Sequence, residues 1–164
     1  MAPVIRRART ADVAAIRRLV DVYAGRILLE KATVQLYEDI QEFFVAELDG
    51  DVVGCGALHV MWEDLAEVRT VAVRPEFKGR GLGSALLTGL LQDARDLGVQ
   101  RVFCLTFETG FFGGHGFQPI DGQAVEPQVY AELLRSYDEG VAEFLDLERV
   151  KPNTLGNTRM LLTL

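Results

Sequence analysis

Apolar residues recur at helical spacing in two stretches of the first hundred residues. In the longer one, leucines and an alanine return every three or four positions from Leu82 to Leu97, and Gly98 follows directly. This pattern predicts an amphipathic helix that ends at a glycine. The earlier stretch is apolar at Val13, Ile16, Val20 and Tyr23.

The earlier helix also carries start and stop signals. Thr10 is the expected N-cap, Asp12 falls in the first turn, where a negative charge is favourable, and the helix is expected to end near Gly25. A further short helix is predicted over residues 33–40, from the spacing of Val34, Tyr37 and Ile40.

Runs of β-branched and apolar residues predict strands, two of them joined as a hairpin. Asp49-Gly50 lies between two such runs, and this dipeptide is a strong hairpin signal. A short helical or turn segment is expected to end at Gly116-Phe117. The predicted strands are 4–8, 43–48, 52–61, 67–73, 101–106 and 159–164. The predicted class is α/β (α+β), with a mixed, mostly antiparallel sheet and flanking helices.

Composition narrows the range of functions. The 164 residues are 49% hydrophobic, and 24 acidic against 17 basic residues give a net charge of −7. One domain over 1–164 is expected, with neither nucleic acid nor a membrane as partner, because an acidic chain repels both phosphate polymers and anionic lipid. No apolar run approaches the roughly 20 residues of a membrane span, and no signal peptide is evident, so we expect a cytoplasmic protein.

The cysteines and histidines indicate packing rather than metal chemistry. Cys55 and Cys104 each lie within an apolar stretch, where a thiol behaves as a small hydrophobic side chain. The only histidines, His59 and His115, form no metal-ligand spacing with each other or with the cysteines. We therefore expect no metal cofactor.

The most informative segment joins the strand that ends at Val73 to the helix that begins near Leu82. Glycines at 79, 81 and 83 expose backbone N–H groups beside the positive end of that helix, a typical environment for a phosphate. From Arg69 to Arg80 there are four basic residues and one acidic residue, so the local charge is opposite to that of the whole chain. The spacing fits neither a Walker loop nor a dinucleotide fingerprint. The alternative is a glycine-rich turn that caps a helix and binds no ligand.

The segment 78–83, Lys-Gly-Arg-Gly-Leu-Gly, resembles the (Gln/Arg)-x-x-Gly-x-(Gly/Ala) element of the GNAT acetyltransferases, with lysine at its first position. The order of elements up to Gly116-Phe117 is also similar to that family. The resemblance implies a GNAT fold, in which the sheet splays at the acetyl-CoA site. It implies that backbone groups of one strand pair with the pantetheine arm, and that the loop holds the pyrophosphate. The cofactor residues so implied are Val71, Ala72, Val73, Lys78, Gly79, Arg80, Gly81, Leu82, Gly83 and Ser84.

A narrower similarity concerns the acetyl acceptor. The stretches 5–8, 25–29, 66–73 and 105–117 resemble the acetyltransferase domain of N-acetylglutamate synthases, above all the short stand-alone actinobacterial type. This implies acetylation of the α-amine of L-glutamate, or of glutamine, at the start of arginine biosynthesis. The alternatives are acetylation of another small amine or a protein amine, and a non-catalytic CoA-binding module.

The resemblance also suggests a general base. Glu67 matches an acidic residue of these synthases and would remove a proton from the ammonium group of the acceptor. Strand alternation places it on the same side as Arg69 and Val71 unless a bulge intervenes. The amide of Val71 or a neighbour would stabilise the oxyanion. The alternative is an exposed carboxylate that pairs with Arg69.

The remaining site residues are implied less directly. The family often has a tyrosine that protonates the thiolate, but Phe112 stands there, with Tyr130 and Tyr137 as substitutes. Lys151 is a further candidate cation for the substrate carboxylates, and each candidate cation is otherwise a solvated surface charge. The residues implied to bind the amino acid are Lys31, Arg69, Thr70, Thr158 and Arg159.

The segment 121–152 has no counterpart in a minimal GNAT domain. The positions of Tyr130, Leu133, Leu134 and Tyr137 suggest an amphipathic helix, and 141–147 a further element. The segment either covers the acceptor pocket or forms a contact between two copies in a homodimer, and simple packing is the default interpretation.

Overall fold

The computed structural model describes residues 2–24 and 32–164, with the backbone alone at 152 and 153. The chain forms two compact units, and each of two strands contributes residues to both. The first holds Met1–His59 and Val68–Leu97, and the second holds Val60–Glu67 and Gly98–Leu164. In the described part of the chain, no helix is both long and apolar enough to cross a membrane.

The strands form a mixed sheet of order β1-β2-β3-β4-β5-β7-β6. Their bounds are β1 Val4–Arg7, β2 Phe43–Leu48, β3 Asp51–Trp62, β4 Leu65–Val73, β5 Arg101–Thr106, β6 Gln118–Pro119 and β7 Thr158–Thr163. The β4–β5 pair is parallel, whereas β1–β2, β2–β3, β5–β7 and β6–β7 are antiparallel. The α+β class and the mostly antiparallel sheet are therefore confirmed.

The helices are short apart from two. Their bounds are α1 Val13–Tyr23, α2 Thr33–Glu38, α3 Leu82–Leu97, α4 Thr109–Gly114, α5 Pro127–Leu133, α6 Glu139–Phe144 and α7 Lys151–Thr154. Single 3₁₀ turns lie at η1 Thr10–Asp12, η2 Ile40–Glu42, η3 Pro75–Phe77 and η4 Glu148–Val150.

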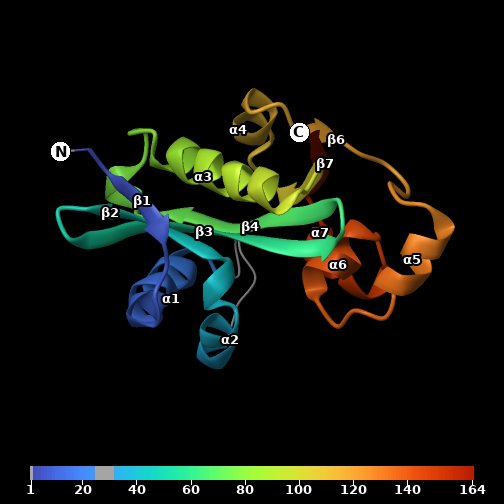
Figure 1. The fold of residues 1–164 in the computed structure, drawn as a ribbon, viewed down its shortest axis with the longest axis horizontal. Helices are drawn as coiled ribbons and strands as arrows, with labels where there is room; N and C mark the ends of the chain where they lie inside the picture. Colours follow the sequence, from blue (N-terminus) through green and yellow to red (C-terminus); the bar gives the residue numbers. More distant parts are fainter. Residues whose placement is uncertain (1, 25–31) are drawn as a thin grey trace. The chain divides into compact units, whose positions relative to one another are not determined.

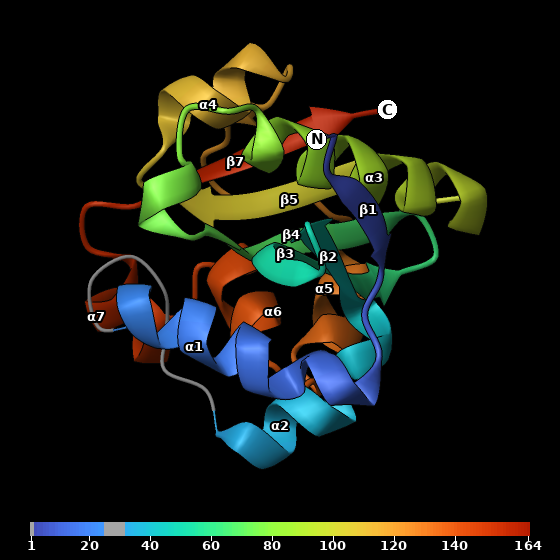
Figure 2. The same cartoon turned by 90° about the vertical axis from the view of Figure 1, so that its left-hand side faces the viewer.

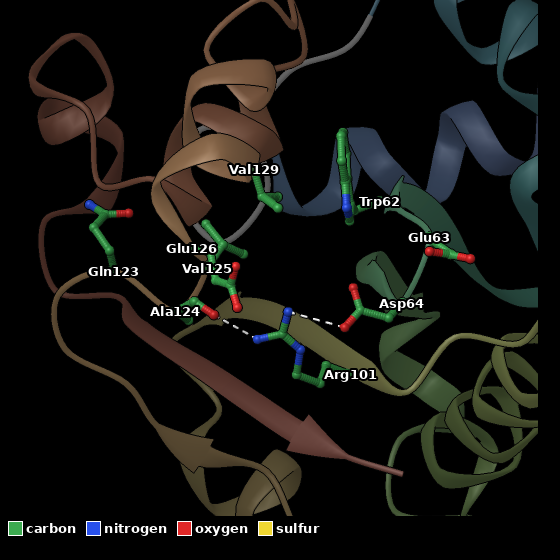
Figure 3. Close-up of a pocket in the computed structure, with 9 residues that line it drawn as sticks. All are labelled: Trp62, Glu63, Asp64, Arg101, Gln123, Ala124, Val125, Glu126 and Val129. Atoms are coloured by element: carbon green, nitrogen blue, oxygen red, sulfur yellow. Dashed lines mark hydrogen bonds and ion pairs between the residues drawn. The ribbon is translucent and has the colours of Figure 1, made fainter.

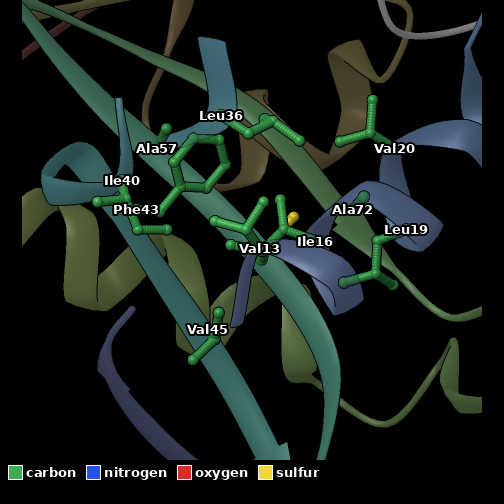
Figure 4. Packing of buried hydrophobic residues seen from close by; sticks show 11 residues of the cluster. Val13, Ile16, Leu19, Val20, Leu36, Ile40, Phe43, Val45, Ala57 and Ala72 are labelled. Atoms are coloured by element: carbon green, nitrogen blue, oxygen red, sulfur yellow. The ribbon is translucent and has the colours of Figure 1, made fainter. Parts of the chain in front are cut away.

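In the first unit, α1 and α3 lie on opposite faces of the strands (Figures 1 and 2). On the α1 face, Ile16 and Leu36 pack with Phe43, Val45 and other apolar side chains (Figure 4). On the α3 face, Leu82 and Leu86 pack against the alternate strand positions, such as Ala46 and Val53. Alternate residues of β2 thus pack in two separate apolar clusters, one on each face of the strand.

Two turn predictions are confirmed by the backbone. Asp49 and Gly50 have φ of 52° and 87°, as in a type I′ turn, and they join β2 to β3. Gly98 has φ of 91° directly after α3, which is the left-handed conformation expected of a C-terminal glycine.

The predicted cap at Thr10 is wrong. Thr10 is the first residue of η1, and the carboxylate of Asp12 accepts a hydrogen bond from the backbone N–H of Arg9 at 2.7 Å. Arg6 donates to the same carboxylate at 2.8 Å. The long-range ion pair with β1 holds Asp12 in this position, which a local cap signal does not reveal.

The second unit has its own core. Phe103 of β5 meets Phe144 of α6 edge to face, with ring centroids 5.2 Å apart, and Leu133 of α5 joins the cluster. The helix expected through Leu134 and Tyr137 is shorter than predicted, because α5 ends at Leu133. Leu134 is 48% exposed and Tyr137 98% exposed, so neither contributes to the core.

We expect Asp12→Asn to destabilise the protein by about 1–2 kcal/mol at neutral pH, because it removes a charge-assisted pair. The hydrogen bond from Arg6 holds the pKa of Asp12 below its usual value of 3.8. The stabilisation is therefore complete above that value and is lost as the pH falls through the lower pKa of the folded state. Denaturant unfolding at several pH values measures it. Asp21→Asn, at a carboxylate 53% exposed, is the control. A difference from the wild type that persists unchanged in strong acid would contradict the pairing.

Candidate active site

The glycine-rich loop links β4 to α3 within the first unit. After η3, Gly79 and Gly81 have φ of 80° and 79°, a conformation in which any residue but glycine is strained. A Cβ atom at either position would meet nothing within 4 Å, so the loop backbone borders open space. The N–H of Ala85 donates to the carbonyl of Gly81 at 3.0 Å, which makes Gly81 the residue before the first turn of α3. The amides of this turn run in the direction that favours an anion at the loop.

The loop itself carries positively charged side chains. The Nζ of Lys78 lies 4.9 Å from the ring centroid of Tyr23, and the guanidinium of Arg80 lies 5.1 Å from that of Phe77. Arg74 is partly neutralised, because it pairs with Glu76 at 3.1 Å. Aromatic contacts leave the charges of Lys78 and Arg80 in place, so the positive local field expected from the sequence is present.

Tyr23 is a residue of this site that the sequence did not single out. Its hydroxyl donates to the carbonyl of Val73 at 2.6 Å, and its ring lies below the Lys78 ammonium. One side chain from the end of α1 therefore joins the last residue of β4 to the loop. The helical spacing had placed Tyr23 in an apolar stripe, where the role of its hydroxyl is not visible.

The backbone of β4 departs from a regular strand at Thr70. This residue has φ of 59°, which is a strained conformation for a β-branched side chain, and its exposed fraction is only 7%. Ala72 packs in the α1 cluster and Arg69, three positions earlier, pairs with Glu42 at 3.4 Å. Val71 instead lies beside Gly56, at a point that also neighbours Leu90 of α3. We infer a bulge here, the exception allowed for in the predicted alternation, so Arg69 and Val71 do not share a side.

Glu67 is the last residue of β4 that is paired with β5. It is 2% exposed and is in register with Phe103 of β5. The alternative interpretation of an exposed strand carboxylate is therefore wrong. Burial, and then the charge of Glu67, raise the pKa of the Cys104 thiol. A carboxylate in such surroundings has the low solvation that favours proton transfer, and its role as general base stays a prediction.

At the position where the resemblance implies a tyrosine, the chain has the apolar ring of Phe112. Phe112 is 7% exposed and makes an edge contact with Phe117 at 5.2 Å. Of the two suggested substitutes, Tyr137 is almost fully exposed, and Tyr130 packs partly buried against the core of the second unit.

The implied acceptor residues fall in different places. Arg69 and Thr70 lie on β4 in the first unit, and Thr158 and Arg159 lie on β7 in the second. Lys31 lies outside the described residues.

Two cations of the second unit have structural partners. The guanidinium of Arg159 donates to the carbonyls of Glu143 at 3.2 Å and Gly122 at 3.1 Å, and also to that of Phe144. Burial lowers its pKa. Lys151 pairs with Asp146. Substrate binding by Arg159 stays a prediction. The structure gives this residue a further role, because its hydrogen bonds link β7 to α6.

The model of the acetyltransferase (GNAT) family matches residues 14–117, which include β4, the glycine loop and α3. The chain belongs to the GNAT family. An amino-acid acetyltransferase of Mycobacterium tuberculosis is 65% identical over 99% of this chain and 95% of its own length. A crystal structure from the same organism, in complex with CoA and a second ligand, has a TM-score of 0.96, 65% identity and 98% coverage of this chain and 99% of that one. An N-acetylglutamate synthase of Neisseria gonorrhoeae, in complex with coenzyme A and N-acetyl-glutamate, has a TM-score of 0.79 and 26% identity over all of this chain and 35% of the other.

A hollow in the second unit of this GNAT protein is lined by described residues that the sequence did not single out. It is a pocket of about 650 Å³ between the β3–β4 turn, β5 and residues 123–126 (Figure 3). At its centre Arg101 pairs with Asp64 at 3.3 Å and donates to the carbonyl of Ala124 at 2.6 Å. Trp62 forms part of the wall. These interactions attach the start of the 121–152 segment to β5.

We expect Gly81→Asp to weaken acetyl-CoA binding by at least about 100-fold, because a carboxylate would face the phosphates across a short distance. Isothermal titration calorimetry with CoA measures this. Gly50→Asp is a matched control, since Gly50 also has positive φ and open space around its Cβ position but lies in the hairpin turn. Unchanged affinity in Gly81→Asp would remove the loop from the cofactor site.

Proposed function

We propose that this GNAT enzyme transfers the acetyl group of acetyl-CoA to the α-amine of L-glutamate, as the first step of arginine biosynthesis. The observation that carries the proposal is the 65% identity, over nearly the full length of both chains, to a protein named amino-acid acetyltransferase. The similarity to a synthase bound to coenzyme A and N-acetyl-glutamate supports glutamate over other amino acids. L-Glutamine is the second acceptor to be considered.

The cofactor would be held mainly by backbone. The amides from Gly79 to Ser84 would bind the pyrophosphate, because left-handed glycines and a helix start leave N–H groups directed at the ligand. Val71, Ala72 and Val73 would pair with the pantetheine arm. Lys78 and Arg80 add two positive charges beside the loop, in a protein whose net charge is −7.

The chemistry needs a proton acceptor first. An α-ammonium group has a pKa of about 8, so at neutral pH most of the acceptor must lose a proton before it can attack. Glu67 would accept this proton, directly or through water. The amine nitrogen then forms a bond to the thioester carbon, and the N–H of Val71 would stabilise the resulting oxyanion. The nitrogen then loses its second proton to water, and collapse breaks the carbon–sulfur bond and releases N-acetylglutamate and the CoA thiolate.

No acid from the chain is needed for the last step. A thiol has a pKa of about 8.5, so thiolate is a tolerable leaving group, and water can return its proton. This explains how Phe112 can occupy a position where other family members carry tyrosine. The side chains proposed for the glutamate carboxylates are those of Arg69, Thr70, Thr158 and Arg159, together with Lys31.

The proposed acceptor can be tested by a screen. We expect thiol release from acetyl-CoA to be fastest with L-glutamate or L-glutamine among the twenty amino acids, because only these two carry a side-chain carbonyl group two methylene groups from Cα, where the cations would meet it. A spectrophotometric thiol assay measures it. Release with none of them, in a protein that still binds acetyl-CoA, would contradict the proposal and favour a CoA-binding module.

The proposed base has its own test. We expect Glu67→Gln to lower kcat by about 10²–10⁴-fold with little change in the affinity for acetyl-CoA, because the amide cannot accept the proton. Glu143→Gln is the control, since Glu143 is the other buried glutamate of the described chain, 5% exposed. If both variants lose the same small fraction of kcat, Glu67 has no part in proton transfer.

A further inference from the structure

Cys55 of β3 lies against the bulge of β4, and its thiol bonds to a backbone carbonyl there. The Sγ atom donates to the carbonyl of Thr70 at 3.4 Å. The side chain is fully buried. Burial raises the pKa of the thiol to about 12, so the thiol keeps the proton that it donates. It therefore holds the peptide group that Thr70 shares with Val71.

This bond fixes the orientation of the peptide group between Thr70 and Val71. Each peptide group is planar and trans, so its C=O and N–H point in opposite directions. The Thr70 carbonyl shares a peptide group with the Val71 N–H. Because the Thr70 C=O points to Cys55, the N–H of Val71 must point away from it.

The arrangement compensates for what the bulge disrupts. A bulge leaves backbone groups out of register with the neighbouring strand, and buried groups of this kind need partners. Thr70 is 7% exposed, so water offers its carbonyl little replacement. The thiol is a weak donor, and it serves as a partner of that carbonyl.

We propose that Cys55 is a positioning residue for acetyl transfer, which holds the bulge of β4 so that the Val71 N–H faces the thioester. This inference rests on the proposed function, in which that N–H stabilises the oxyanion. The sequence had assigned Cys55 to simple packing, and its hydrogen bond now gives it a second role. Cys104, also buried but on β5, supplies a natural control.

The test compares Cys55→Val with Cys55→Ser. Valine fills the space but leaves the Thr70 carbonyl without this partner, whereas serine keeps a donor. We expect valine to lower kcat by about tenfold or more, because small misplacements of catalytic groups are costly. Serine should restore most of the loss. The Kd for CoA should change by less than about threefold, since the loop provides most of the binding.

A second readout does not depend on activity. In ¹⁵N-labelled protein, the amide resonance of Val71 should move in Cys55→Val, stay near the wild-type position in Cys55→Ser, and be unaffected in Cys104→Val. If Cys55→Val does not fold, Cys55→Ala gives the same comparison. If the wild type acetylates no amino acid, the proposed function fails, but the Val71 resonance still decides whether Cys55 orients the peptide.

Two results would overturn the inference. One is a normal kcat and an unmoved Val71 resonance in Cys55→Val. The other is an equal loss of kcat in Cys55→Val and Cys104→Val in proportion to their loss of melting temperature, which would show that both thiols act only through packing.

Discussion

The left-handed conformation of Thr70 is the constraint on which the arrangement of β4 depends. A β-branched residue with φ of 59° costs free energy, and it persists only because the surroundings hold it. Arg69 is held by Glu42 on one side of it, and Ala72 by the α1 cluster on the other. The shift of one residue lets Ala72 face α1 and Val71 face α3 while the strand continues to the glycine loop.

In the proposed function, the glycine loop offsets the unfavourable net charge of the chain by short-range interactions. In a chain of net charge −7, the long-range field disfavours a polyanionic cofactor. Backbone amides at Gly79 and Gly81, the first turn of α3, and the cations of Lys78 and Arg80 act at short range, where screening by salt and distance matters least. Tyr23 supports this region in two ways. Its hydroxyl donates to the carbonyl of Val73 at the end of β4, and its ring contacts the ammonium group of Lys78.

The second unit uses its charged groups for attachment. Arg159 binds carbonyls at the end of α6, and Arg101 binds the carbonyl of Ala124 and pairs with Asp64. The two arginines anchor parts of the 121–152 segment to β5 and β7. This assigns the segment a packed position in its unit, in agreement with the default interpretation from the sequence, whereas a role over the acceptor or in a dimer stays a prediction.

The sequence by itself determined several features that short-range signals encode. Asp49-Gly50 specified the hairpin, the leucine spacing and Gly98 specified α3, and the glycines at 79 and 81 specified a loop before α3, because each depends on residues within a few positions. The cap at Thr10, the length of α5, the bulge at Thr70 and the contacts of Tyr23 and Cys55 were decided only by the tertiary structure. Each of these depends on atoms brought together from distant segments, such as Arg6 with Asp12 or Cys55 with Thr70, and neither propensity nor periodicity carries that information.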